Sequence, residues 1–187
     1  MSSSIYLGID SSSRYLALAL WSREGVLARF CEEAGRDHAA RVGGALEALL
    51  EQANVRRSAL AGIGVGTGPG SYTGLRVGVA VAQGLAQGLG VALRGESSFG
   101  AMAAAQLTRT NPKGVVALDA RRGNVYAGVF ERVGETFCCN RLEKVARETL
   151  QARYPDLPYF ENVPPDAAYL AQRVAEAGAG DVAPLYL

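Results

Sequence analysis

The sequence predicts a two-lobed α/β protein, and three observations lead to this prediction. An apolar strand ending in Asp, a polar turn and a second strand occur in that order twice, around Asp10 and around Asp119. In the first half, short apolar runs alternate with two longer segments of helical character. A polar stretch with an Asn-Pro pair, residues 108–114, separates the two halves. At 187 residues the chain can bury one large or two small hydrophobic cores.

The elements of the first half follow from their hydrophobic patterns. Residues 36–52 carry an apolar stripe at helical spacing, and residues 74–88 form a second, nearly uncharged helix. Ser97 or Ser98 is placed to cap a third helix that ends near Leu107. Short apolar runs bounded by turn residues predict strands at residues 5–10, 15–21, 26–32, 61–65 and 91–94.

The second half is shorter in predicted elements and richer in proline. We predict an N-terminal lobe over residues 1–107, which holds the two long helices, and a smaller C-terminal lobe over residues 108–187. The C-terminal lobe is predicted to contain strands at residues 115–119, 124–132 and 135–139, followed by helices at residues 141–153 and 167–177.

The composition indicates an ordinary globular protein from a reducing compartment. Lys and Arg number 19 against 18 Asp and Glu, and the arginines are scattered, so no basic run predicts autonomous nucleic-acid binding. Cys31, Cys138 and Cys139 form neither a CxxC motif nor an even disulfide framework. The N-terminus carries no recognisable secretory signal, and no segment has the composition of a membrane span. We therefore predict a cytoplasmic protein.

A glycine-rich turn, residues 64–76, connects a strand to the uncharged helix. It lacks the Lys of a phosphate-binding P-loop, and its glycines fit no frame of the dinucleotide fingerprint. Ser71 or Thr73 can cap the helix, which leaves an anion site at the helix N-terminus as one interpretation. We favour the other interpretation, in which the turn formed by Gly68, Pro69 and Gly70 allows close backbone packing.

The helix after this turn has small residues at four-residue spacing and no charge from Val77 to Leu93. Gly74 and Gly78 share one face, and Ala80, Gly84 and Gly88 share one face. Glycine costs about 1 kcal/mol relative to Ala in a helix interior, so several glycines require a packing reason. Either the helix is buried on all sides within this chain, or it packs on a sheet on one side and on a partner protein on the other.

The repeated strand–turn–strand pattern points to a specific architecture. In two-lobed actin-like and sugar-kinase-like ATPases, two such turns face each other across a cleft, where carboxylates hold Mg²⁺ and turn N–H groups hold phosphates. Asp10, Ser11, Ser12 and Asp119 are therefore candidates for a nucleotide site, in active or relict form. The alternative is that Asp10 and Asp119 stabilise hairpin turns.

Candidates for catalysis are few. His38 is the only histidine, which excludes a zinc site with two His ligands and leaves a Ser/His/Asp triad dependent on one residue. His38 lies near the start of the helix at residues 36–52, where we expect it to cap the helix or to be exposed to solvent. We predict no metal site and no cofactor.

Four segments together identify a resemblance to a known family. They are Gly8-Ile9-Asp10-Ser11-Ser12, the string from Gly66 through Gly-Pro-Gly-Ser-Tyr-Thr-Gly-Leu-Arg to Gly78, the segment Ala117-Leu118-Asp119-Ala120-Arg121-Arg122-Gly123-Asn124-Val125-Tyr126, and the closing Pro184-Leu185-Tyr186-Leu187. With these segments, in this order, the chain resembles the bacterial TsaB (YeaZ) family, whose members take part in the synthesis of threonylcarbamoyladenosine in tRNA.

The resemblance implies an actin-like (ASKHA, ribonuclease H-like) fold with mixed sheets flanked by helices and no catalytic activity of its own. It implies that the chain binds and activates the catalytic relative TsaD as a heterodimer, with the ATPase TsaE joining a larger complex. It further implies a homodimer when the chain is alone, and tRNA contact only indirectly through the complex. A small ATPase or phosphotransferase using Asp10 and Asp119 is the alternative function.

In TsaB-like proteins the partner surface is formed by the two N-lobe helices, which pair with two helices of TsaD in a four-helix bundle. In this sequence those helices correspond to residues 36–52 and 74–88. The candidate contact residues are Leu46, Leu49, Leu50, Leu75, Val79, Ala80, Gln83, Gly84 and Gln87.

Overall fold

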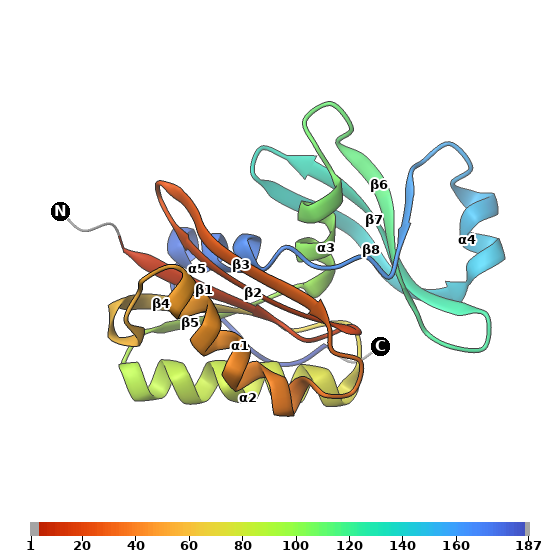
Figure 1. The fold of residues 1–187 in the computed structure, drawn as a ribbon. Coiled ribbons are helices and arrows are strands. Elements are labelled where there is room, and N and C mark those ends of the chain that lie inside the picture. The colour runs from red at the N-terminus through yellow and green to blue at the C-terminus, as the bar shows by residue number, and fades with distance from the viewer. Residues whose placement is uncertain (1–3, 186–187) are drawn as a thin grey trace.

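The computed structural model describes residues 4–185 and has two lobes, each built on one mixed β-sheet (Figure 1). Tyr186 and Leu187 of the closing motif lie outside the described residues. The N-terminal sheet has the strand order β3-β2-β1-β4-β5, and the C-terminal sheet has the order β8-β7-β6-β9. The strands are β1 (Ile5–Asp10), β2 (Tyr15–Ser22), β3 (Gly25–Glu33), β4 (Leu60–Gly66), β5 (Ala92–Glu96), β6 (Lys113–Asp119), β7 (Asn124–Val133), β8 (Thr136–Ala146) and β9 (Tyr159–Glu161).

The repeat predicted from the sequence is present in the topology. In each lobe three antiparallel strands follow one another, and a later strand pairs in parallel with the first. Asp10 ends β1 opposite Ala17, and Asp119 ends β6 opposite Val125, so the two carboxylates occupy equivalent positions.

The helices cover both faces of each sheet. They are α1 (His38–Gln52), α2 (Tyr72–Leu89), α3 (Ser98–Gln106), α4 (Arg147–Arg153) and α5 (Ala167–Ala177), with a short 3₁₀ helix at Arg57–Ala59. In Figure 1, α1 and α2 lie together on one face of the N-terminal sheet, and α5 lies on the other. The largest core forms where leucines and valines of α1 and α2 meet apolar side chains of β1, β2 and β4.

Helix α5 approaches its sheet so closely that two strand positions must be glycine. A Cβ on Gly8 would lie 1.8 Å from the carbonyl oxygen of Ala167, and one on Gly64 would lie 2.0 Å from that of Leu170. Helix α5 therefore packs with the N-terminal sheet, although it lies within residues 108–187, which the sequence predicts to form the C-terminal lobe.

The C-terminal sheet lies between α3 on one face and α4 on the other. Phe99 and Met102 of α3 pack on Val116 and Phe130, while Leu150 of α4 packs on the opposite face. None of the helices within residues 4–185 is long and apolar enough to cross a membrane.

Two expectations for the secondary structure are corrected, and one strand was missed. The first long helix begins at His38 and not at residue 36. The segment predicted as a helix from residue 141 continues β8 as far as Ala146, because it pairs along the length of β7, and only Arg147–Arg153 are helical. Strand β9 was not predicted at all.

Candidate functional site

The glycine-rich turn packs against the turn between β1 and β2. Ser71 caps α2 by accepting the N–H of Gly74 at 3.3 Å, and its own N–H donates to the carbonyl oxygen of Ser12 at 2.6 Å. A Cβ on Gly70 would lie 2.1 Å from that Ser12 oxygen, and one on Gly74 would lie 2.1 Å from the carbonyl oxygen of Ser11. These glycines serve close packing within the chain, which is the interpretation that the sequence favoured.

Asp10 lies beneath this contact and is fully buried. Its Oδ1 accepts the N–H of Ser12 at 2.8 Å and the Ser12 hydroxyl at 2.7 Å, whereas Oδ2 has no hydrogen bond of normal geometry among the described residues. Burial raises the pKa of Asp10, and the hydrogen bonds from Ser12 oppose the shift. Ser11 and Ser12 are buried as well, and the Ser11 hydroxyl donates to the carbonyl oxygen of Gly74 at 2.8 Å.

A cleft of about 620 Å³ opens between the lobes. Asp10 and Ser11 do not line it, while Ser12 and Asp119 do. The structure therefore does not bring Asp10 and Asp119 to one surface, as a Mg²⁺ site formed by both would need. The lining residues are Ser12, Ser13, Arg14, Gly35, Arg36, Gly70, Ser71, Tyr72, Thr73, Leu118, Asp119, Ala120, Arg121, Tyr126 and Asn162.

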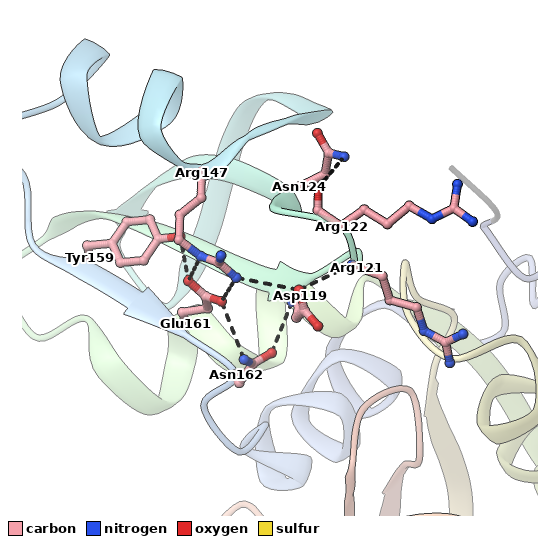
Figure 2. Close-up of polar contacts among 8 residues, drawn as sticks. All are labelled: Asp119, Arg121, Arg122, Asn124, Arg147, Tyr159, Glu161 and Asn162. Carbon is pink, nitrogen blue, oxygen red and sulfur yellow. Dashed lines mark hydrogen bonds and ion pairs between the residues drawn. The ribbon is translucent and has the colours of Figure 1, made fainter.

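Asp119 belongs to a polar network on the C-terminal side of the cleft (Figure 2). Its Oδ1 accepts the backbone N–H of Arg121 at 3.1 Å and the Nη2 of Arg147 at 3.4 Å, and its own N–H donates to Oδ1 of Asn162 at 3.0 Å. Arg147 holds Glu161 through two hydrogen bonds of 2.7 and 2.9 Å. Oδ1 of Asp119 thus already accepts hydrogen bonds from the Arg147 guanidinium and from a backbone N–H.

The same network perturbs its titratable groups. The hydrogen bonds from Arg147 lower the pKa of Glu161, and those to Glu161 raise the pKa of Arg147. The Tyr159 hydroxyl donates to Oε2 of Glu161 at 2.8 Å, and burial is the main cause that raises the pKa of Tyr159 to about 12. Sequence reasoning missed Arg147, Glu161 and Asn162, since they come from elements far from Asp119 along the chain.

The predicted partner surface divides into a buried and an exposed set. The exposed set consists of Ala80, Gln83, Gly84 and Gln87, all on the outer side of α2. The other five side chains face the sheet, because the apolar stripe of each helix fills the core beneath it; Leu46, Leu49, Leu50, Leu75 and Val79 are at most 7% exposed. We correct the predicted contact face accordingly, and the exposed four remain a prediction.

Open space characterises the outer face of both helices. A Cβ added to Gly84 or Gly88 of α2 meets no atom within 4 Å, and the same holds for Gly43 and Gly44 of α1. Gly43 and Gly44 were overlooked in the sequence, although two adjacent glycines inside a predicted helix are a signal of the same kind. The glycines of α1 and α2 thus form two sets. At the inner set, Gly74 and Gly78, an added Cβ would meet other atoms of the chain. At the outer set, Gly43, Gly44, Gly84 and Gly88, it would meet none within residues 4–185.

Comparison with known proteins identifies the family. A family model described as TsaD, tRNA N6-adenosine threonylcarbamoyltransferase, matches residues 26–175. This chain belongs to the TsaD family. A comparison with curated proteins gave no match.

Two solved structures share the fold of this TsaD-family chain over almost its whole length. An uncharacterized protein with similarity to peptidase YeaZ from Pseudomonas aeruginosa has a TM-score of 0.84 at 24% identity, over 98% of this chain and 99% of that chain. YeaZ from Pseudomonas aeruginosa has a TM-score of 0.82 at 24% identity, over 98% of this chain and 100% of that chain. The predicted actin-like, YeaZ-like fold is confirmed.

The one histidine of this TsaD-family chain is buried and contacts the backbone of a strand. His38 is 3% exposed, and its Nε2 lies 3.2 Å from the carbonyl oxygen of Tyr15. The expectation that it caps α1 or faces solvent was wrong, because the first turn of α1 packs onto β2. Among residues 4–185 no three His, Cys, Asp or Glu side chains are grouped closely enough to hold a metal ion together.

Proposed function

We propose that this chain is a non-catalytic subunit that binds and activates TsaD in the synthesis of threonylcarbamoyladenosine, beside the anticodon of tRNAs that read codons starting with A. Membership of the TsaD family supports the tRNA-modification setting. The chain would act in the cytoplasm and join TsaE in a larger complex. When alone, it would form a homodimer through the surface that binds TsaD.

The outer face of α1 and α2 carries this proposal. Gly43, Gly44, Gly84 and Gly88 each cost about 1 kcal/mol relative to Ala in a helix, and within residues 4–185 a Cβ added to any of them would meet no atom within 4 Å. Helices pack at axial distances of about 8–10 Å, and small residues allow the nearest approach. A pair of helices from a partner would use the space that these glycines leave open.

The state of the candidate catalytic groups supports a non-catalytic role. Asp10 is buried away from the cleft, Asp119 is paired with Arg147, and His38 is buried against β2. An ATPase of this architecture would need its carboxylates directed at the phosphates and the metal. The alternative function of ATPase or phosphotransferase would need two carboxylates in the cleft, and the described lining residues supply only Asp119, which is paired with Arg147.

The test is to place an arginine on the outer face and measure pairing with TsaD. Ala80→Arg and Gly84→Arg keep exposed positions exposed, so each variant should retain its circular dichroism spectrum and lose co-elution with TsaD. Ala152→Arg on α4 is the matched control, since it adds the same side chain to an exposed helix position of the other lobe. If both α2 variants still co-elute with TsaD as the control does, this surface is not the interface.

A further inference from the structure

Two arginines that line the cleft between the lobes, and a third directly beside one of them in the chain, have no ion-pair partner within residues 4–185. Arg36 precedes α1 and lines the cleft from the N-terminal lobe, and Arg121 lines it from the turn between β6 and β7. Arg122 follows Arg121 in the same turn. Elsewhere the exposed arginines of this chain commonly pair with Glu or Asp, as Arg29 does with Asp166 and Arg109 with Glu135.

Acidic groups do little to balance this charge. Asp119 is the one carboxylate among the described lining residues, and Arg147 lies 3.4 Å from it. Arg14 also lines the cleft, and its ion pair with Glu33 is long, at 3.6 Å. The cleft therefore carries an excess of positive charge, which attracts anions at a distance of several ångström.

The turn that carries Arg121 and Arg122 is held in an unusual conformation. Their φ angles of 66° and 54° lie in the left-handed region, which costs about 1 kcal/mol or more per non-glycine residue. Asp119 keeps the turn in place by accepting the Arg121 N–H, and Arg147 and Asn162 fix Asp119. In Figure 2 both arginine side chains extend away from this network, so the network positions the turn and leaves the two guanidinium groups for another ligand.

An aromatic side chain completes the cleft on the opposite lobe. Tyr72, in the first turn of α2, lines the cleft and is 58% exposed. The guanidinium of Arg76 lies over its ring at 5.4 Å from the centroid. Exposed aromatic rings beside arginines are the combination on which unstacked bases bind in single-stranded nucleic acids.

We propose that this cleft binds single-stranded RNA directly, with Arg36, Arg121 and Arg122 on backbone phosphates and Tyr72 stacked on a base. The proposal rests on the proposed function, since the RNA would be the tRNA that the complex modifies, and it goes beyond indirect contact. A nucleotide with Mg²⁺ fits less well, because the carboxylates that would hold the metal are buried or paired. A phosphodiester chain needs cations and stacking only.

The test uses a fluorescein-labelled RNA hairpin with a single-stranded loop, titrated with the pure chain and with its complex with TsaD at several salt concentrations. The Arg121→Ala/Arg122→Ala variant should bind about tenfold or more weakly. The slope of log K against log salt should fall by about 0.7 for each arginine removed. Tyr72→Ala should weaken binding and leave the salt slope unchanged. Tyr72→Phe should bind as tightly as the wild type, because the ring and not the hydroxyl stacks on a base.

Arg23→Ala is the matched control, because Arg23 is an exposed arginine in the turn at the far end of β2. Equal losses for Arg23→Ala and the double variant would mean non-specific attraction and would overturn the proposal. The proposal would also be overturned if ATP with Mg²⁺, or polyglutamate, displaced the labelled RNA at the same concentration at which unlabelled RNA displaces it. The double variant should still co-elute with TsaD; a wild-type chain that binds RNA but not TsaD would refute the proposed function and leave this inference standing.

Discussion

Helix α2 contains a matched pair of glycines for which the structure predicts opposite responses to the same change. Gly74, in its first turn, faces the β1–β2 turn, and Gly84 faces outward. We predict that Gly74→Ala destabilises the protein and that Gly84→Ala stabilises it. We also predict that Gly84→Ala weakens pairing with TsaD, so that its effects on stability and on binding have opposite signs.

The magnitudes follow from the space at each position. At Gly84 an added Cβ meets nothing within 4 Å, so the variant should gain the helix propensity of alanine, about 1 kcal/mol. At Gly74 the Cβ would lie 2.1 Å from the Ser11 carbonyl oxygen, where ordinary contact begins at 3.4 Å, so the backbone must move by about 1.3 Å. Ser11 is 1% exposed and cannot yield outward, and overpacking of this kind costs about 1–3 kcal/mol or more.

Urea unfolding followed by circular dichroism measures both free energies of unfolding. The two variants should differ by about 2–4 kcal/mol, with the wild type between them. For a chain of this size each kcal/mol corresponds to about 2–4 °C in melting temperature, which provides a second measurement. A Gly84→Ala variant less stable than the wild type, or a neutral Gly74→Ala, would refute the division of the glycines into an inner and an outer set.

Two further predictions concern titratable groups with shifted pKa values. Burial raises the pKa of Asp10, so the stability that its proton contributes is complete below the unfolded pKa of about 3.9 and is lost as the pH rises through the folded pKa. Asp10→Asn keeps an oxygen that can accept from Ser12, so in urea unfolding at neutral pH it should be at least as stable as the wild type. A large decrease in its free energy of unfolding would contradict the inference that burial of the Asp10 carboxylate is unfavourable. The pKa of Glu161 is lowered, so its pairing with Arg147 stabilises the fold above the unfolded pKa of about 4.3 and ceases to do so as the pH falls through the folded pKa. Glu161→Gln should lose about 1 kcal/mol or less at neutral pH, because the pair is partly exposed, and should approach the wild type in acid; a difference that grows in acid would argue against it.

The architecture could be predicted because it is encoded in local patterns that occur twice. Asp10 and Asp119 each end a strand, and the antiparallel partner follows directly, so the repeat is visible in the sequence. The error at residues 141–146 has the opposite cause. Their composition allows a helix, but β7 presents a long row of backbone groups, and pairing with it outweighs local propensity.

The candidate site could be predicted only in part, since burial and long-range contacts decide it. Helix α2 has apolar or small residues on both faces, so the pattern could not separate the core side chain of Leu75 from the outer position of Gly84. The contacts of Asp119 with Arg147 and Asn162 join residues 28 and 43 positions apart, and no motif spacing records such a network. The arginines that line the cleft look scattered in the sequence, because Arg36 and Arg121 come from different lobes.

The two proposed surfaces meet on one helix without sharing a residue. Tyr72 belongs to the cleft, and Ala80, eight residues later, belongs to the outer face, which separates them by about 12 Å along the axis of α2. Changes this far apart with no common partner usually have independent effects. Ala80→Arg should therefore abolish pairing with TsaD while the isolated chain still binds the RNA hairpin, and the Arg121→Ala/Arg122→Ala variant should do the reverse. Because α2 is continuous between the two surfaces, a partner docked on its outer face would be held next to RNA lying across the cleft.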